Sequence, residues 1–185
     1  MDVHTALRSR RTIHAYTTDP VPPEALVRAL DAARFAPNHG LSFPWRFTQV
    51  GPGGRDVIAA LYVRLKEEAA GCLSETKAAR YHAKVRDPPE LIVVSQVRCE
   101  DPFKSKEDYA SVAIAIHNLM LSLHADGVGS KWSTGGITRH AETYVVCGID
   151  AAAQEIVGFV WVGVPLRVPR MAERPELSAL VSTTT

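Results

Sequence analysis

Two apolar runs limit the folds open to this chain. "ELIVVSQV" occupies residues 90 to 97, and "EIVGFVWVGVP" occupies residues 155 to 165. Both runs are short, rich in β-branched residues and almost free of charge, which is typical of strands buried on both faces of a sheet. We therefore expect these two segments to be core strands.

A long helical pattern lies between the two runs. Ser105 and Asp108 match a capping box, and an apolar stripe follows at helical spacing until Gly127. The stripe and its apolar neighbours are Val112, Ile114, Ala115, Ile116, Leu119, Met120, Leu121 and Leu123. A helix that is apolar nearly all round is buried in a core or in a subunit interface.

The rest of the chain predicts more helices than strands. A strand is expected for "WRFTQV", residues 45 to 50, where aromatic and β-branched residues lie between Pro44 and Gly51. "GSKWSTGG", residues 129 to 136, is expected to form a tight segment. Helices are expected at residues 2–10, from Pro22 to Pro37, around 58–65, from Ser74 to Pro88 and within 138–147. Strands separated by helices indicate an α+β or α/β fold.

Composition limits the classes of partner. The chain of 185 residues fits one domain, in which residues 166–185 form a basic, proline-punctuated C-terminal tail. Its net charge of +1 gives no reason to expect nucleic acid or an anionic membrane. The three cysteines are widely spaced, and no apolar run reaches the length of a membrane span. We expect a cytoplasmic protein without structural disulfides.

Several common motifs fail on their context. "GVGSKW" resembles the start of a dinucleotide fingerprint but follows a helix and lacks the third glycine. None of the seven histidines belongs to an H-E-x-x-H motif, so no metal site is expected, and His117 and His124 are interpreted as packed or surface residues. No G-x-S-x-G elbow is present, and no cysteine has the context of a nucleophile.

"RSRRTIHAY" at the end of the first helix carries the clearest binding signal. Arg10, Arg11, Thr12 and His14 place forked cationic donors, a hydroxyl and an imidazole along a short stretch of backbone. Such a set suits a phosphate and a polar ring system. The alternative is that the two arginines are solvated cations at a helix C-terminus, where the helix dipole favours them.

Three separated stretches together resemble the FMN-dependent nitroreductase family. They are "RRTIHAY" followed by "PVPPEALVRALDAARFAPNHGLSFPWRF", then "GVGSKWSTG", then "EIVGFVWVGVP". Their order and spacing match the family over about residues 3 to 165. The match is closest to the short, minimal members of the NAD(P)H nitroreductase subgroup, which also carry a histidine in the alanine-proline loop.

The resemblance implies a fold and an activity. It implies an α+β fold with a central, mainly antiparallel sheet, and a homodimer with FMN at the subunit interface. It also implies ping-pong hydride transfer, in which NADH or NADPH reduces FMN and a nitroaromatic, quinone or enone acceptor oxidises it. Since the cofactor performs the chemistry, no catalytic residue is expected beyond groups that polarise the flavin.

The resemblance also assigns residues to the cofactor site. Arg10, Arg11 and Thr12 would hold phosphate and ribityl oxygens, and His14 and Arg11 are the candidates to polarise the ring. Phe35 and His39 would reach the flavin of the opposite subunit. Trp132, Ser133 and Thr134 would line the same cofactor, and Arg174 would close on the phosphate. Many relatives have a glutamine where this chain has Phe43, and the minimal members have a basic residue where it has Phe35, so we expect flat, uncharged acceptors to be preferred.

Other activities stay open on the sequence alone. The family includes flavin-fragmenting enzymes and dehydrogenases that oxidise azoline rings. A protein that binds FMN as a redox sensor without turnover would carry the same residues. A helix-rich interaction domain with solvated arginines would explain the motifs without any flavin.

Overall fold

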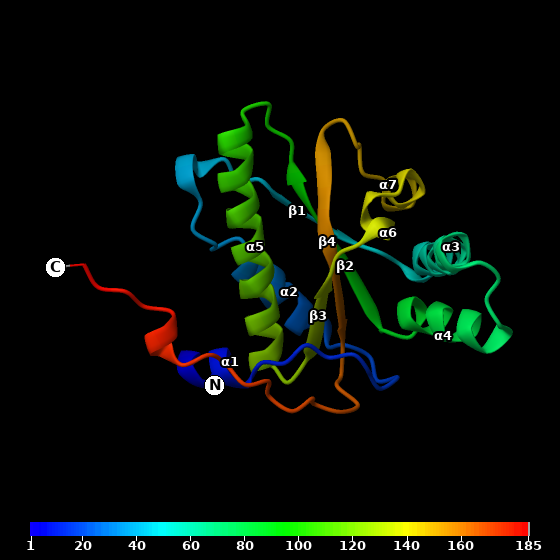
Figure 1. Cartoon of the computed structure of the whole chain (residues 1–185), viewed down its shortest axis with the longest axis horizontal. Helices are drawn as coiled ribbons and strands as arrows, with labels where there is room; N and C mark the ends of the chain where they lie inside the picture. Colours follow the sequence, from blue (N-terminus) through cyan, green and yellow to red (C-terminus); the bar gives the residue numbers. More distant parts are fainter. Residues whose placement is uncertain (185) are drawn as a thin grey trace.

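A four-stranded antiparallel sheet forms the centre of the computed structural model, which describes residues 1–184 (Figure 1). The strands are β1 (Trp45–Gln49), β2 (Glu90–Val97), β3 (Gly129–Ser133) and β4 (Gln154–Gly163), in the spatial order β1-β2-β4-β3. The two apolar runs supply the inner strands β2 and β4, so the predicted core strands are confirmed. All three strand pairs are antiparallel, which agrees with the α+β class and excludes α/β.

Helices cover both faces of the sheet (Figure 1). On one face lie α2 (Pro23–Ala33) and α5 (Pro102–Ala125), which pack on a core that includes Ile92, Val94 and Val160. On the other face lie α3 (Pro52–Ala70), α4 (Glu75–Arg86), α6 (Gly136–Arg139) and α7 (Ala141–Cys147). Their core includes Leu91, Val93 and Phe159, as expected when alternate residues of a strand point to opposite faces.

The start of α5 differs from the prediction. Asp101 is the N-cap, and its carboxylate accepts hydrogen bonds from the backbone N–H groups of Phe103 and Lys104. The helix begins at Pro102, so Ser105 and Asp108 lie inside it and the predicted capping box is wrong. Pro102 explains the earlier start, because its fixed φ and missing N–H suit the first helical position. Asp108 is instead 3% exposed on the core side of the helix.

The segment "GSKWSTGG" also differs from the prediction. Its first part is the edge strand β3, which pairs with β4 from Gly129 to Ser133, and only its glycine end forms the turn into α6. Gly158 of β4 explains part of this pairing. A Cβ atom there would lie 2.2 Å from Nε1 of Trp132, so only glycine leaves room for the indole on the neighbouring strand.

The ends of the elements follow local signals. Ser74 caps α4 by accepting a hydrogen bond from the N–H of Lys77, as predicted. The helix expected within residues 138–147 is divided at His140, whose extended backbone ends α6 and whose side chain caps α7. α1 (Val3–Ser9) lies against the C-terminal end of α5, and η1 (His39–Leu41) follows α2.

The chain beyond β4 runs over the surface. Residues 166–184 are exposed, and their one regular element is the 3-10 turn η2 (Leu177–Ala179). No helix within residues 1–184 has both the length and the apolar composition needed to cross a membrane.

Candidate functional site

The two arginines after α1 have different surroundings. Arg11 donates from Nη1 to the backbone carbonyls of Arg8, at 2.6 Å, and Arg10, at 2.8 Å, so that it stabilises the end of the helix. Arg10 has a buried Nη1 atom with no hydrogen-bond partner within residues 1–184. Because a buried donor without a partner is costly, Arg10 is the member of the pair that is free to bind an external acceptor.

Within residues 1–184, no ion pair neutralises the positive charge around Arg10. Burial, followed by the charges of Arg11 and Arg174, lowers the pKa of the Arg10 guanidinium. Arg174 of the exposed tail therefore lies near enough to act on Arg10. None of the ion pairs found in residues 1–184 involves Arg10. A depression of about 230 Å³ beside Arg10 and Arg11 therefore has the electrostatics of an anion site.

The residues after Arg11 are fixed against the edge of the sheet. Thr12 forms a parallel bridge with Ser130, and the N–H of Ile13 donates to the Ser130 carbonyl at 3.1 Å. The hydroxyl of Tyr16 donates to the Ile13 carbonyl at 2.9 Å. Ile13 is buried while Thr12 and His14 are exposed on either side of it, as alternation along an extended segment requires.

His14 lies within a second group of cations. It lines a depression of about 310 Å³ with Lys84, Lys131 and Tyr16. Burial, then the charges of Lys131, Lys84 and Arg167, lowers the pKa of His14, and burial followed by Lys84 lowers the pKa of Lys131. Sequence reasoning missed Lys84 and Lys131. Lys131 stands in the segment "GVGSKWSTG" but was given no role there, Lys84 stands in no motif, and only the folded chain brings the end of α4 beside β3.

Trp132, Ser133 and Thr134, the predicted site residues at the end of β3, do not all lie on one face of the sheet. Ser133 faces the α3 and α4 side, where its Oγ accepts a hydrogen bond from Nε1 of Trp161 at 2.8 Å. Trp132 faces the α5 side and packs on the core there, with its own Nε1 buried and unpartnered among the described residues. The backbone carbonyl of Ser130 points away from β4 and accepts the hydrogen bond from Ile13. In an antiparallel pair every second residue points its backbone groups the same way, so the N–H and C=O of Trp132 also point outward at the open edge of β3.

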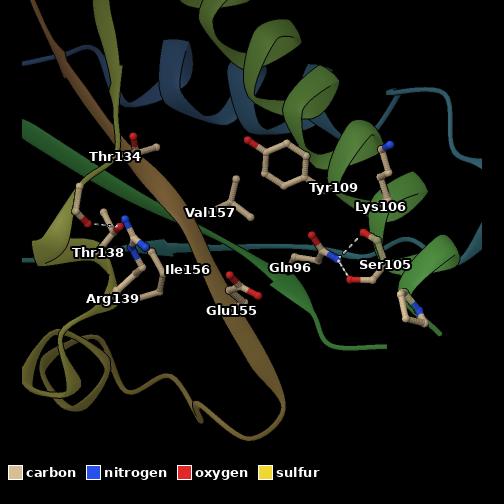
Figure 2. A pocket seen from close by; sticks show the side chains of 12 residues that line it. Gln96, Ser105, Lys106, Tyr109, Thr134, Thr138, Arg139, Glu155, Ile156 and Val157 are labelled. Carbon is tan, nitrogen blue, oxygen red and sulfur yellow. Dashed lines mark hydrogen bonds between the residues drawn. The ribbon is translucent and has the colours of Figure 1, made fainter. Parts of the chain in front are cut away.

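Thr134 borders a wider cleft of about 440 Å³ between α5 and α6 (Figure 2). Figure 2 shows Val157 of β4 between Thr134 and the ring of Tyr109. Lys106 and Arg139 supply cations to this cleft, and Glu155 supplies a carboxylate. Thr134 also lines a smaller depression of about 100 Å³ with Lys131 and Ser133. The end of β3 is thus open on both faces of the sheet.

Phe35 and His39 lie away from this edge. Phe35 is 68% exposed and lines a groove of about 400 Å³ between α1, the end of α2 and α5. His39 is exposed on η1, which lies beyond α5 from β3 in the view of Figure 1. Within one chain the structure therefore gathers Arg10, Arg11, Thr12, His14, Ser133 and Thr134 along β3, with Arg174 nearby. It does not bring Phe35 or His39 to them.

Acidification is expected to destabilise the contact between α1 and α5. The Oγ of Ser9 donates to the Thr5 carbonyl and bonds Nε2 of His124 at 2.7 Å, so the imidazole is the donor in that bond. Burial, then the charges of Arg10 and Arg11, lowers the pKa of His124. The unfolded chain therefore binds this proton at higher pH than the folded chain does, and stability falls as the pH drops below about 6.5.

Replacing His124 with Gln tests this pH dependence. Gln retains an N–H donor for Ser9 but does not titrate, so the melting temperature of His124→Gln should fall less between about pH 7 and about pH 5. His14 and His117 also have lowered pKa values, so some dependence should remain. An equal fall in melting temperature for the wild type and His124→Gln across this pH range would contradict the role of His124.

Comparison with known proteins agrees with the fold. The family model described as "Nitroreductase family" matches residues 7–164. The Bacillus subtilis protein named "Putative NAD(P)H nitroreductase YfhC" is 25% identical over 169 residues, covering 91% of this chain and 87% of the relative. A 5,6-dimethylbenzimidazole synthase from Rhodospirillum rubrum is 30% identical over 135 residues, covering 66% of this chain and 64% of the relative.

A solved structure supports the same likeness. A Desulfovibrio desulfuricans protein, described as a putative nitroreductase in complex with FMN, superposes with a TM-score of 0.78 and 26% sequence identity. The match covers 99% of this chain and 96% of that one. The similarity therefore extends over the whole sheet, its helices and the segment that contains Arg10 and His14.

Proposed function

This chain belongs to the nitroreductase family, and from that premise we propose that it is an FMN-dependent oxidoreductase. In this proposal NADH or NADPH reduces FMN, and a nitroaromatic, quinone or enone-type acceptor then oxidises it by a ping-pong mechanism. The residues gathered along β3 are here called the strip: Arg10, Arg11, Thr12, His14, Ser133 and Thr134. The observation that carries the proposal is the Nη1 atom of Arg10 at one end of this strip, which is buried and has no hydrogen-bond partner among the described residues.

The strip fits the two ends of FMN. Arg10, with Thr12 and Arg174 nearby, would hold the phosphate through charge-assisted hydrogen bonds. From Gly129 to Thr134 the edge of β3 runs for about 17 Å at the usual rise of a strand. That length is comparable with an extended flavin mononucleotide, so the ring would lie near Ser133, Thr134 and the open backbone edge of Trp132.

The cations at the ring end suit a reduced flavin. When bound, FMN supplies the hydride acceptor and donor, and its reduced ring carries negative charge around N1. His14, Lys84 and Lys131 are clustered where they would donate to that charge, whereas Arg11, also a candidate from the sequence, lies beside Arg10 at the phosphate end. Lys131 is held over the ring of Trp161, 6.0 Å from its centroid, which limits the motion of its ammonium group.

The site is proposed to be completed by a second copy of the chain. Phe35 lines a groove with α1 and α5, and η1, which carries His39, lies beyond α5 from β3, although the family resemblance assigns both residues to the flavin. In a homodimer the partner's Phe35 and the partner's His39 would cover the open ring. The exposed groove beside Phe35 and the exposed Ile114 of α5 provide apolar surface for that interface.

Steady-state turnover tests the proposed activity. Purified protein with FMN should oxidise many equivalents of NADPH or NADH when menadione or a nitroarene is present. A neutral nitroarene should react faster than a matched charged one, because Phe35 and Phe43 expose apolar surface. A protein that binds FMN but does not turn over with any of these acceptors would instead be a flavin-binding or sensing protein.

Flavin fragmentation is the second candidate, favoured by the similarity to the 5,6-dimethylbenzimidazole synthase. The ring system of FMN contains the same dimethylated benzene ring as that product. A fragmenting enzyme would consume its own reduced FMN in air, so the flavin absorbance would be lost permanently. An oxidoreductase would regain its full absorbance once the reductant is exhausted, and this comparison separates the two.

Lys131 is expected to accelerate flavin reduction. Removing its charge in Lys131→Met should lower the rate of reduction by NADPH by about tenfold to a hundredfold and make the flavin midpoint potential more negative. Lys131→Arg should restore much of both. Lys66→Met is a matched control, because Lys66 lies 5.3 Å over the ring of Tyr62 and lines none of the depressions along β3. Equal rates and potentials for Lys131→Met and Lys66→Met would refute the role.

A further inference from the structure

The loop between α2 and β1 concentrates unfavourable backbone geometry. Gly40, Leu41 and Phe43 have φ angles of 69°, 50° and 45°. Within residues 1–184, Leu41 and Phe43 are the non-glycine residues with positive φ. A side chain is crowded in that region of φ, so such residues persist only where surrounding contacts hold them.

Asn38 holds the loop from within. Its Oδ1 accepts a hydrogen bond from the backbone N–H of Phe43 at 2.7 Å, which closes the loop across the strained residues. Its Nδ2 donates to Oγ of Ser42 and to Oγ of Ser111, each at 3.1 Å. One amide thus joins the start of the loop, its end and the surface of α5.

Asp108 fixes this network to the core. Oγ of Ser42 donates a hydrogen bond to Oδ1 of Asp108, which is 3% exposed on α5. None of the ion pairs found in residues 1–184 includes Asp108. A buried carboxylate without a cation is costly. Asp101 caps the helix, so Asp108 is not needed there, and the hydrogen-bond partner of Asp108 is Ser42 of the loop.

We propose that Asp108 is a positioning residue that acts through Ser42 and Asn38. These three residues, here called the loop anchor, hold residues 38–43 in their strained conformation and thereby fix His39, which follows Asn38 directly. The inference rests on the proposed function in one respect, because the fixed loop is the segment that would complete the flavin site of the partner. Without the anchor, Leu41 and Phe43 are free to relax to negative φ and His39 moves with them.

Two readouts test the loop anchor in the full-length protein. The first is the hydrogen exchange of the Phe43 amide in the apoprotein, which reports the bond to Asn38 directly. The second is the Kd for FMN, from the quenching of flavin fluorescence. Ser42→Ala and Asp108→Ala remove the anchor, whereas Asp108→Asn retains an oxygen that can accept from Ser42. Ser95→Ala is the matched control, because it removes another hydroxyl with a side-chain partner, Gln154, at 2.7 Å.

The expected results separate the anchor from general stability. Ser42→Ala and Asp108→Ala should speed exchange at Phe43 by at least about tenfold and raise the Kd for FMN by about tenfold, the effect of losing one charge-assisted hydrogen bond. Asp108→Asn should stay near wild type in both. Ser95→Ala should change neither, although it also removes a buried hydrogen bond. The double variant Ser42→Ala/Asp108→Ala should be no worse than Asp108→Ala, because both changes break one connection.

The outcomes that overturn the proposal differ from those that overturn the function. Unchanged exchange at Phe43 in Ser42→Ala would show that the anchor does not hold the loop. If Ser42→Ala exchanged faster at Phe43 but bound FMN as tightly as Ser95→Ala does, the loop would not serve the flavin site. Failure of the wild-type protein to bind FMN would refute the proposed function, and the exchange data would still decide the anchor. Should Asp108→Ala not fold, Ser42→Ala and Asp108→Asn decide both points.

Discussion

Replacing Arg10 with Gln is expected to weaken FMN binding by about a hundredfold, the largest effect of any single change outside the hydrophobic core. The buried Nη1 of Arg10 has no partner among the described residues, so a phosphate would provide its missing acceptor. Charge-assisted hydrogen bonds contribute about 1.5–3 kcal/mol each, and about 1.4 kcal/mol is a factor of ten in Kd. Titration of the apoprotein with FMN measures the change.

The stability of the apoprotein should move in the opposite direction. Arg10→Gln removes a partly buried cation that no ion pair compensates, so the melting temperature of the apoprotein should stay the same or rise. Binding residues often lower the stability of the unliganded protein in this way. Arg11→Gln should weaken FMN binding less, because the donors of Arg11 already serve backbone carbonyls. Arg8→Gln removes an exposed charge from the same helix and is the matched control. Equal FMN affinities for Arg10→Gln and Arg8→Gln would contradict the assignment.

Replacing Ile114 with Arg is expected to produce a monomer that binds FMN at least about tenfold more weakly. Ile114 is 38% exposed on α5, the helix against which the loop of Phe35 and His39 packs. In the proposed homodimer this substitution would place a charge in an apolar interface, which costs several kcal/mol, so that dimer should dissociate. Loss of the dimer removes the partner's His39 and the partner's Phe35 from the site. Light scattering gives the mass, and FMN titration gives the affinity.

Val57→Arg separates this effect from a general effect of surface charge. Val57 is 43% exposed on α3, on the opposite face of the sheet, so its substitution adds the same charge to a site of similar exposure. It should remain dimeric and bind FMN like the wild type. A monomeric Ile114→Arg protein with unchanged FMN affinity would show that one chain suffices for the site.

The core of the fold was predictable because a strand buried on both faces has a continuous apolar run in its own sequence. β2 and β4 are buried on both faces, and their apolar runs identified them as core strands. β3 was not predicted, because an edge strand of half-buried residues such as Lys131 and Ser133 carries no such run. The start of α5 was misplaced because the capping-box match of Ser105 and Asp108 was chosen over the local signal that holds, Asp101 followed by Pro102. Asp108 instead has a tertiary partner, Ser42.

The candidate site was predictable only in part. The sequence selected Arg10 and Arg11 together, but only the folded chain shows that Arg11 binds backbone carbonyls while Arg10 has a free donor. Lys84 and Lys131 join His14 through tertiary structure, so no spacing within the sequence could indicate them. Phe35 and His39 came from the family resemblance, and their role in the site of a second subunit stays a prediction.

We propose that the strip along β3 binds FMN and that NADH or NADPH reduces it there. An anaerobic absorbance titration measures both the binding and the reduction. Protein purified or incubated with FMN and freed of excess should show flavin absorbance near one FMN per chain, which bleaches on addition of NADPH or NADH and returns when menadione is added. Protein that stays colourless after incubation with FMN would refute FMN binding at this strip, and bound flavin that neither nicotinamide reduces would refute the proposed reductase activity.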